Sequence, residues 1–272
     1  MFNLKNKVVV ITGGAGFLGR KHAEAVAEFG ANPVILDLFE ESARKVAEEI
    51  SKKYNVNAFG TALDITNEEA VKNCCDFIIG KYGSIDVLIN NAANNPKVDS
   101  KGGVKNSSRL ENFDLNLWNQ DIAVGLTGAF LCAKYFGYAI SKNTDGGSII
   151  NISSDLGIIG PDQRLYRKKG LSEEQQPVKP VTYSVVKTGL VGLTKYLATY
   201  WADKNVRCNA VCPGGVYNNQ ADEFVKKVSS LIPMGRMAKP DEYKGIIVFL
   251  ASGASSYMNG SVISIDGGRT AW

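Results

Sequence analysis

Tyr183 and Lys187 are the residues whose types and spacing point most directly to chemistry. They lie four positions apart in the stretch Tyr-Ser-Val-Val-Lys, and residues four apart share one face of a helix. A tyrosine titrates near pH ~10, so alone it is a poor base in neutral water. A lysine cation beside it favours the phenolate and lowers its pKa. The pair predicts an acid–base group for proton exchange with an alcohol, although the spacing also fits a partly buried tyrosine beside a solvated lysine.

The elements that would position this pair alternate between strands and helices. Short β-branched runs are followed by stretches with helical spacing of their apolar residues. This pattern predicts strands at 7–12, 33–38, 57–63, 86–90, 148–152, 206–211 and 261–265, and helices at 18–29, 40–54, 67–82, 110–140, 181–202 and 240–251, with 110–140 broken near its start. Such alternation is typical of an α/β fold, a doubly wound parallel sheet of about seven strands in three α/β/α layers. Ligands should then bind at the carboxyl ends of the strands.

Length and composition indicate one domain over 1–272, interrupted by polar insertions near 94–109 and 155–180. The net charge of +4 comes without a basic run, so we expect no nucleic-acid partner. No apolar run approaches ~20 residues and no signal-like segment opens the chain, so we expect no membrane partner. The five cysteines are irregularly spaced, which fits a reducing cytoplasm. Cys208 and Cys212 could suggest a metal site, but the single histidine of the chain, His22, lies far away in sequence. We therefore expect no metal site.

A glycine-rich turn connects the first predicted strand to the first helix. Glycines at this point allow a tight turn and close approach of the backbone to a pyrophosphate, which the helix N-terminus also favours. The alternative is an ordinary turn, but its place between strand and helix favours a nucleotide site. The predicted cofactor contacts here are Gly13, Gly16, Phe17, Leu18 and Gly19.

Acidic and amide residues at the ends of the next strands extend this site. Asp37, followed by Leu38, comes 24 residues after Gly13. A carboxylate there accepts hydrogen bonds from ribose hydroxyls and repels a 2′-phosphate, so the sequence favours NAD over NADP. The alternative is a solvated aspartate at a strand end. Two further groups would flank the cofactor, although each also fits a simple turn: Asp64 with Ile65, and Asn91 with Ala92 and Ala93.

Taken in order, these motifs resemble the short-chain dehydrogenase/reductase family over nearly the whole chain. The matching residues are Thr12–Gly19, Asp37, Asp64, Asn90 to Ala93, Asn151 to Ser154, Tyr183, Lys187, Pro213, Gly214 and Asp266 to Gly268. The resemblance implies a Rossmann-like fold and an NAD(P)-dependent enzyme acting on CH–OH groups. The expected function is an NAD-dependent oxidoreductase that interconverts a secondary alcohol and a ketone, with a small-molecule substrate.

The resemblance also implies roles for single residues. Ser154 would hydrogen-bond the substrate oxygen, although it also fits a turn serine. Tyr183 would exchange the proton. Lys187 would hold the nicotinamide ribose and lower the pKa of the tyrosine. The nicotinamide end of the cleft would be lined by Ile152, Pro213, Gly214 and Val216.

The resemblance further implies a homodimer or homotetramer, assembled through the helices at 110–140 and 181–202. Small residues on these helices would allow close approach of a neighbouring subunit: Ala123, Gly125, Gly128, Ala129, Gly189, Gly192 and Ala198. The alternative is that they pack against the sheet of their own chain.

The sequence departs from the family pattern at three places. Gly125 replaces the usual asparagine that holds a water beside the lysine, so we expect close packing or a water to fill the gap. Gly16 and Phe17 follow the glycine spacing of epimerase-like members. Tyr183 follows Ser154 by 29 residues, about twice the usual gap, so the insertion should wall the active site. These departures leave two alternatives, a catalytically weakened NAD-binding sensor or partner subunit, and a sugar epimerase or dehydratase with tightly held NAD.

The insertions carry clustered positive charge. Arg164, Arg167, Lys168 and Lys169 lie in the second insertion, and Lys97, Lys101, Lys105 and Arg109 lie in the first beside Asp99. If they rim the cleft they would concentrate anionic substrates. We therefore expect a sugar or an anionic sugar derivative, which also fits a weaker resemblance to members annotated with flagellin modification and surface-glycan synthesis. The alternative is a solvated surface loop.

Overall fold

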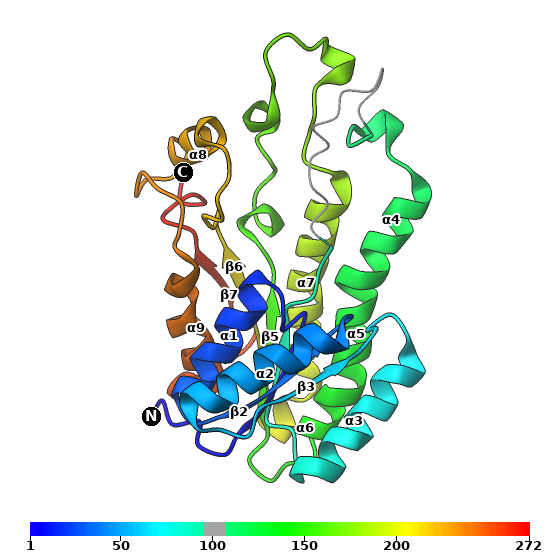
Figure 1. The fold of residues 1–272 in the computed structure, drawn as a ribbon, viewed down its shortest axis with the longest axis vertical. Coiled ribbons are helices and arrows are strands. Elements are labelled where there is room, and N and C mark those ends of the chain that lie inside the picture. Colours follow the sequence, from blue (N-terminus) through cyan, green and yellow to red (C-terminus); the bar gives the residue numbers. More distant parts are fainter. Residues whose placement is uncertain (95–106) are drawn as a thin grey trace.

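A parallel sheet forms the centre of the computed structural model, which describes residues 1–94 and 107–272 (Figure 1). Within these residues the sheet has seven strands in the order β3-β2-β1-β4-β5-β6-β7. The strands are β1 (Val8–Thr12), β2 (Asn32–Asp37), β3 (Phe59–Ala62), β4 (Val87–Asn90), β5 (Gly147–Ile152), β6 (Val206–Pro213) and β7 (Val262–Ile265). The chain winds from β1 out to β3 and then returns to β4 on the other side of β1. This reversal confirms the predicted doubly wound fold and places a crevice beside the carboxyl end of β1.

Helices cover both faces of the sheet because its central strands are apolar on both sides. In β1 every residue is buried, with Val9 and Ile11 packed in one core cluster and Val8 and Val10 in the other. The first cluster includes α1 (Phe17–Glu28), α2 (Glu40–Tyr54) and α9 (Lys244–Ala251). The second includes α3 (Glu68–Tyr82), α5 (Gly128–Cys132), α6 (Tyr138–Ile140) and α7 (Val181–Tyr200).

The long helix expected at 110–140 is interrupted, as predicted. A short 3-10 turn covers Leu110–Asn112, and Asp114 then caps α4 (Leu115–Ile122) by accepting hydrogen bonds from the amides of Asn116 and Leu117. Helical structure continues through π-helical turns at Ala123–Thr127 and Ala133–Gly137. Among the described residues, Leu115–Ile140 is the one stretch long and apolar enough to cross a membrane. Its inner face packs on the sheet through Cys132, Phe136 and Ile140, as a core helix does.

Several boundaries differ from the predicted ones by one or two residues, and some elements were not predicted. Short 3-10 turns occupy Asp155–Gly157, Gln163–Tyr166, Glu173–Gln175, Ala202–Lys204 and Gly253–Ser255. The helix expected at 240–251 begins with a 3-10 turn over Pro240–Tyr243. Helix α8 (Asp222–Ser229) was missed. It is short and amphipathic, it has no buried residue, and it places Phe224 and Val228 on the cavity while touching the Gln163–Tyr166 turn.

Three of the glycines assigned to a subunit interface are packed inside the chain instead. A methyl group added to Gly128 would lie 2.6 Å from Ile65 Cδ1, one added to Gly125 would lie 2.4 Å from Val186 Cγ1, and one added to Gly189 would lie 2.9 Å from Leu126 Cδ2. Gly125 and Gly189 each receive a branched side chain from the other helix, which lets α7 approach the turn Ala123–Thr127 closely. Val186 packs against Gly125, as the close-packing alternative expects, and both residues also line a small cavity described below.

We predict that Gly125→Ala lowers the free energy of unfolding by about 1–3 kcal/mol, because overpacking against Val186 outweighs the gain in helix propensity. Gly80→Ala is the matched control, because Gly80 also lies in a helix and an added methyl group there meets no atom within 4 Å. Gly80→Ala should raise the free energy of unfolding by up to about 1 kcal/mol. Adding Val186→Ala to Gly125→Ala should restore part of the loss in a double-mutant cycle of denaturant unfolding. Strictly additive effects would contradict this contact.

Candidate active site

One cavity of about 980 Å³ lies at the carboxyl ends of the strands and brings the predicted site residues together. A cavity of this size suits a cofactor and a small substrate. All of the predicted catalytic and cofactor-binding residues line it, namely Gly13, Gly16, Phe17, Leu18, Gly19, Asp37, Leu38, Asp64, Ile65, Asn91, Ala92, Ala93, Ile152, Ser154, Tyr183, Lys187, Pro213, Gly214 and Val216. The structure therefore places them in one site, while their individual roles stay predictions.

The glycine-rich turn is held in place before any ligand binds. Gly13 has φ +59°, in the left-handed region, and its carbonyl accepts the amide of Gly16 at 3.1 Å. Asn91 Nδ2 donates to the carbonyls of Thr12 (3.0 Å) and Gly13 (3.1 Å) and so ties the turn to the end of β4. A methyl group on Gly19 would lie 2.1 Å from the Gly13 carbonyl oxygen. This rigid cradle at the N-terminus of α1 fits the pyrophosphate of a dinucleotide.

The carboxylate of Asp37 is fixed beside the same turn. Its Oδ2 accepts the amide of Ala15 at 3.1 Å, and its Oδ1 accepts the amide of Leu38 at 2.9 Å. Leu38 is exposed at the edge of the cavity and offers an apolar surface to a flat base. Asp64 lines the cavity too, but its Oδ1 is used by the amide and hydroxyl of Thr66. The pocket end formed by Asp37 and Leu38 could therefore hold the adenosine of a nicotinamide dinucleotide.

Lys187 joins α7 to the end of β5. Its ammonium donates to the carbonyl of Ile152 at 2.8 Å, and its own carbonyl accepts the hydroxyl of Ser153 at 2.7 Å. The side chain is buried. Burial and, less strongly, repulsion from Lys179 lower the pKa of Lys187 to about 8, and only a weaker effect of Cys212 opposes them. The site therefore holds the ammonium of Lys187 in a place from which stabilising water is excluded.

Tyr183 lies on the cavity side of the same helix. Burial raises its pKa above the ordinary value, the hydroxyl of Ser154 lowers it, and the charge of Asp155 raises it. The expected lowering by Lys187 is not found. The ammonium lies 5.8 Å from the phenol ring centroid, and desolvation of the phenolate outweighs it.

Ser154 is a turn serine, and its position also fits the predicted contact with the substrate. Its hydroxyl donates to Asp155 Oδ1 at 2.7 Å and accepts the amide of Leu156 at 3.2 Å, which caps the turn at Asp155–Gly157. The same side chain lines the cavity beside Tyr183. A turn serine is thus also placed for contact with a substrate oxygen.

A second, small cavity of about 10 Å³ lies behind Tyr183 and Lys187. It has room for about one water molecule. Asp121, one helical turn before Gly125, lines it, and its carboxylate accepts the hydroxyl of Thr182 at 2.6 Å and the amide of Asn94 at 3.2 Å. Sequence reasoning missed Asp121 because it considered only the position of the absent asparagine.

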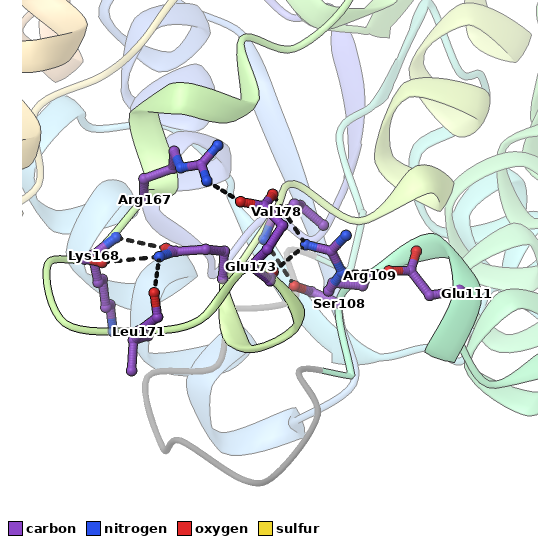
Figure 2. Close-up of polar contacts among 9 residues, drawn as sticks. Ser108, Arg109, Glu111, Arg167, Lys168, Leu171, Glu173 and Val178 are labelled. Atoms are coloured by element: carbon purple, nitrogen blue, oxygen red, sulfur yellow. Dashed lines mark hydrogen bonds and ion pairs between the residues drawn. The ribbon is translucent and has the colours of Figure 1, made fainter.

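The arginines of the insertions form ion pairs with nearby acidic residues, two of them shown in Figure 2. Arg167 pairs with Glu173, whose carbonyl also accepts Arg109 at 2.6 Å, and Arg109 pairs with Glu111. Outside the figure, Arg164 binds both carboxylate oxygens of Asp162 at 2.8 Å. Neither Arg164 nor Arg167 lines the cavity. The expected basic rim is therefore not formed by these arginines, and Lys97, Asp99, Lys101 and Lys105 lie outside the described residues.

Four charged residues that sequence reasoning missed line the substrate end of the cavity: Asp155, Asp162, Lys179 and Arg269. Lys179 Nζ lies 3.6 Å from the centroid of the Tyr183 ring. The one available signal was its position, because Lys179 follows Pro177 closely and directly precedes Pro180, where the helix carrying Tyr183 begins.

Comparisons with known proteins find similarity over nearly the whole chain. Residues 14–270 match the profile of a family described as Enoyl-(Acyl carrier protein) reductase. A trans-4-hydroxycyclohexanecarboxylate dehydrogenase of Sinomonas cyclohexanicum is 35% identical over 270 residues, which cover 97% of this chain and 93% of that protein. A 3-oxoacyl-(acyl-carrier-protein) reductase of Aquifex aeolicus is 33% identical over 269 residues, covering 97% and 98%. The crystal structure of a short-chain type dehydrogenase/reductase from Mycobacterium marinum superimposes with a TM-score of 0.82 at 30% identity, covering 99% and 97%.

Proposed function

Because the chain belongs to the short-chain dehydrogenase/reductase family, we propose that it is an NAD-dependent oxidoreductase that interconverts a secondary alcohol and a ketone. The observation that carries this proposal is the meeting of Ser154, Tyr183 and Lys187 with the glycine-rich turn in one cavity. A bound nicotinamide dinucleotide supplies the hydride acceptor or donor of such a reaction. The protein binds, orients and exchanges the proton.

In this proposal Tyr183 exchanges the hydroxyl proton of the substrate. Because burial raises its pKa, the phenol is protonated at neutral pH and can donate to a ketone oxygen. Oxidation of an alcohol needs the phenolate, so it should be favoured at alkaline pH. Ser154 orients the same oxygen, and Lys187 holds the ribose next to the reacting carbon.

The preference for NAD rests on Asp37. Its carboxylate is fixed by two backbone amides at the adenosine end of the cavity. A 2′-phosphate placed there would meet a like charge, which costs several kcal/mol.

Two sources suggest substrate classes for this proposal, the names of the relatives and the sequence. Relatives named for a hydroxycyclohexanecarboxylate and for a 3-oxoacyl group point to compounds that carry a hydroxyl or oxo group. A sugar or anionic sugar derivative remains the expectation from the sequence. A panel of polyols, sugars, sugar phosphates, nucleotide-linked sugars, alicyclic alcohols and hydroxy acids covers these classes.

We expect Tyr183→Phe to lower the rate of NADH formation with an active member of this panel by at least about 100-fold, because the proton acceptor is lost. NAD binding, measured by calorimetry, should remain within a few-fold of wild type. Equal rates in both proteins would refute the acid–base role.

The same panel distinguishes the alternative functions. No NADH formation with any compound, while NAD still binds, would favour a sensor. NAD retained through purification without net NADH formation would favour an epimerase or dehydratase.

We expect Asp37→Ser to shift the ratio of kcat/KM for NAD over NADP towards NADP by at least about tenfold, because removal of the like charge admits the 2′-phosphate. Each variant provides its own control, since both cofactors are measured on one preparation. An unchanged ratio would show that Asp37 does not select the cofactor.

We further propose that the chain forms a homodimer or homotetramer through α5, α6 and α7. These helices expose large apolar side chains, among them Phe130, Tyr138, Tyr196 and Tyr200. Burial of such a patch between subunits is favourable. Light scattering should give a mass of two or four chains, and Tyr196→Glu should reduce it. A monomer in the wild type would reject the assembly.

A further inference from the structure

We propose that Lys179 binds an anionic group of the substrate, a carboxylate or a phosphate, and so selects substrates that carry one beside the reacting alcohol or ketone. This inference rests on the proposed function and names its substrate class. It assigns the charge recognition to a residue inside the cavity, in place of the basic insertion side chains considered from the sequence.

The backbone at Lys179 is fixed before any substrate binds. Its amide donates to Gln163 Oε1 at 2.8 Å, which joins two distant parts of the insertion. Pro180 follows and disfavours helical backbone at the preceding residue, so Lys179 is held extended immediately before α7. The lysine stem therefore starts from a defined point at the mouth of the active site.

The ammonium of Lys179 lies over the catalytic tyrosine. Its Nζ is 3.6 Å from the centroid of the Tyr183 ring, and the residue lines the same cavity as Ser154. A substrate whose oxygen contacts Tyr183 must therefore pass within reach of this charge. The cation–π contact orients the ammonium but leaves its positive charge uncompensated.

Among the described residues, Lys179 forms no ion pair. Two of the nearby carboxylates are paired with arginines, Glu173 with Arg109 and Arg167, and Asp162 with Arg164. Asp155 accepts the hydroxyl of Ser154 and the amide of Leu156 on Oδ1, and its charge acts on Lys179 without forming an ion pair. Burial accordingly lowers the pKa of Lys179 to about 8, and Asp155 opposes this only in part. A desolvated cation without a counter-ion is costly, and an anion brought by the substrate would remove that cost.

The rest of this cavity end favours an anion on an apolar body. Arg269 adds a second cation that forms no ion pair with the described residues, although the carboxylates of Asp155 and Asp162 line the same cavity and feel its charge. The walls include Leu165, Tyr166, Phe224, Val228 and Met237. A neutral polyol would leave hydroxyl groups unpaired against these side chains, which is unfavourable. A compact hydrocarbon with one charged substituent would satisfy both the walls and the ammonium.

The test is the binding of matched ligands to the NADH-saturated enzyme, measured by calorimetry. The probes are cyclohexanecarboxylate, cyclohexyl phosphate and the neutral cyclohexanemethanol. Wild type should bind one of the anions at least about tenfold more tightly than the neutral alcohol, as expected for a charge-assisted contact. Lys179→Met should remove this preference and leave binding of the alcohol unchanged, while Lys179→Arg should retain most of it. Lys168→Met, a change in the same insertion but outside the cavity, should behave as wild type.

The two anions distinguish the chemical source of the charge, since the tighter one names it as a carboxylate or a phosphate. Equal binding of anions and alcohol by wild type, no binding of either anion, or a preference that survives Lys179→Met would each overturn the proposal. Failure of the proposed function gives a different result. In that case NADH does not bind, or no alcohol or ketone is turned over in a Tyr183-dependent manner, whatever the anion preference.

Discussion

A buried lysine is the constraint on which the arrangement of this site depends. Lys187 is joined to the end of β5 at both its ammonium and its backbone carbonyl, so α7 cannot move relative to the sheet without breaking these hydrogen bonds. The preceding residue, Val186, packs over Gly125 and lets the neighbouring helix come close. Tyr183 lies one turn earlier on the same helix. The position of the tyrosine thus follows from the anchoring of the lysine, and the anchoring requires a cation in a desolvated place.

The insertion between Ser154 and Tyr183 uses its charges in two ways. Both of its arginines pair with acidic residues of the same insertion, Arg164 with Asp162 and Arg167 with Glu173, and exposed pairs of this kind define the loop's shape more than they stabilise it. Lys179 differs because it lies inside the cavity with no ion pair among the described residues. The same segment therefore provides a wall built from paired charges and one unpaired cation directed at the reacting centre.

The sequence predicted the sheet, the glycine-rich turn and the residues that line the cavity, because these depend on short-range patterns. Val8–Thr12 is apolar on both faces, and Gly13 follows it directly. Features that depend on contacts between distant residues were not predictable. The tyrosine and lysine were recognised from their spacing, but the sign of the pKa shift on Tyr183 depends on how deeply the fold buries it. The pairing of Arg167 with Glu173, the role of Val186 over Gly125 and the reach of Lys179 towards Tyr183 all depend on how the insertion and α7 pack.

The central claim is that Lys187 is a charge kept for catalysis at the expense of stability, and Lys187→Met tests it most directly. Its pKa falls from the ordinary value of 10.5 to about 8, which corresponds to about 3 kcal/mol. The hydrogen bond lost with the charge offsets about 1 kcal/mol of this. Below pH about 8 the lysine is charged in both the folded and the unfolded chain, so its penalty is fully present. It disappears as the pH rises from about 8 to 10.5, where the folded lysine is already neutral.

We therefore predict that Lys187→Met raises the free energy of unfolding by about 1–2 kcal/mol at neutral pH, that this gain shrinks at alkaline pH, and that NADH formation is lost. A variant that is less stable than wild type and still active would contradict the account.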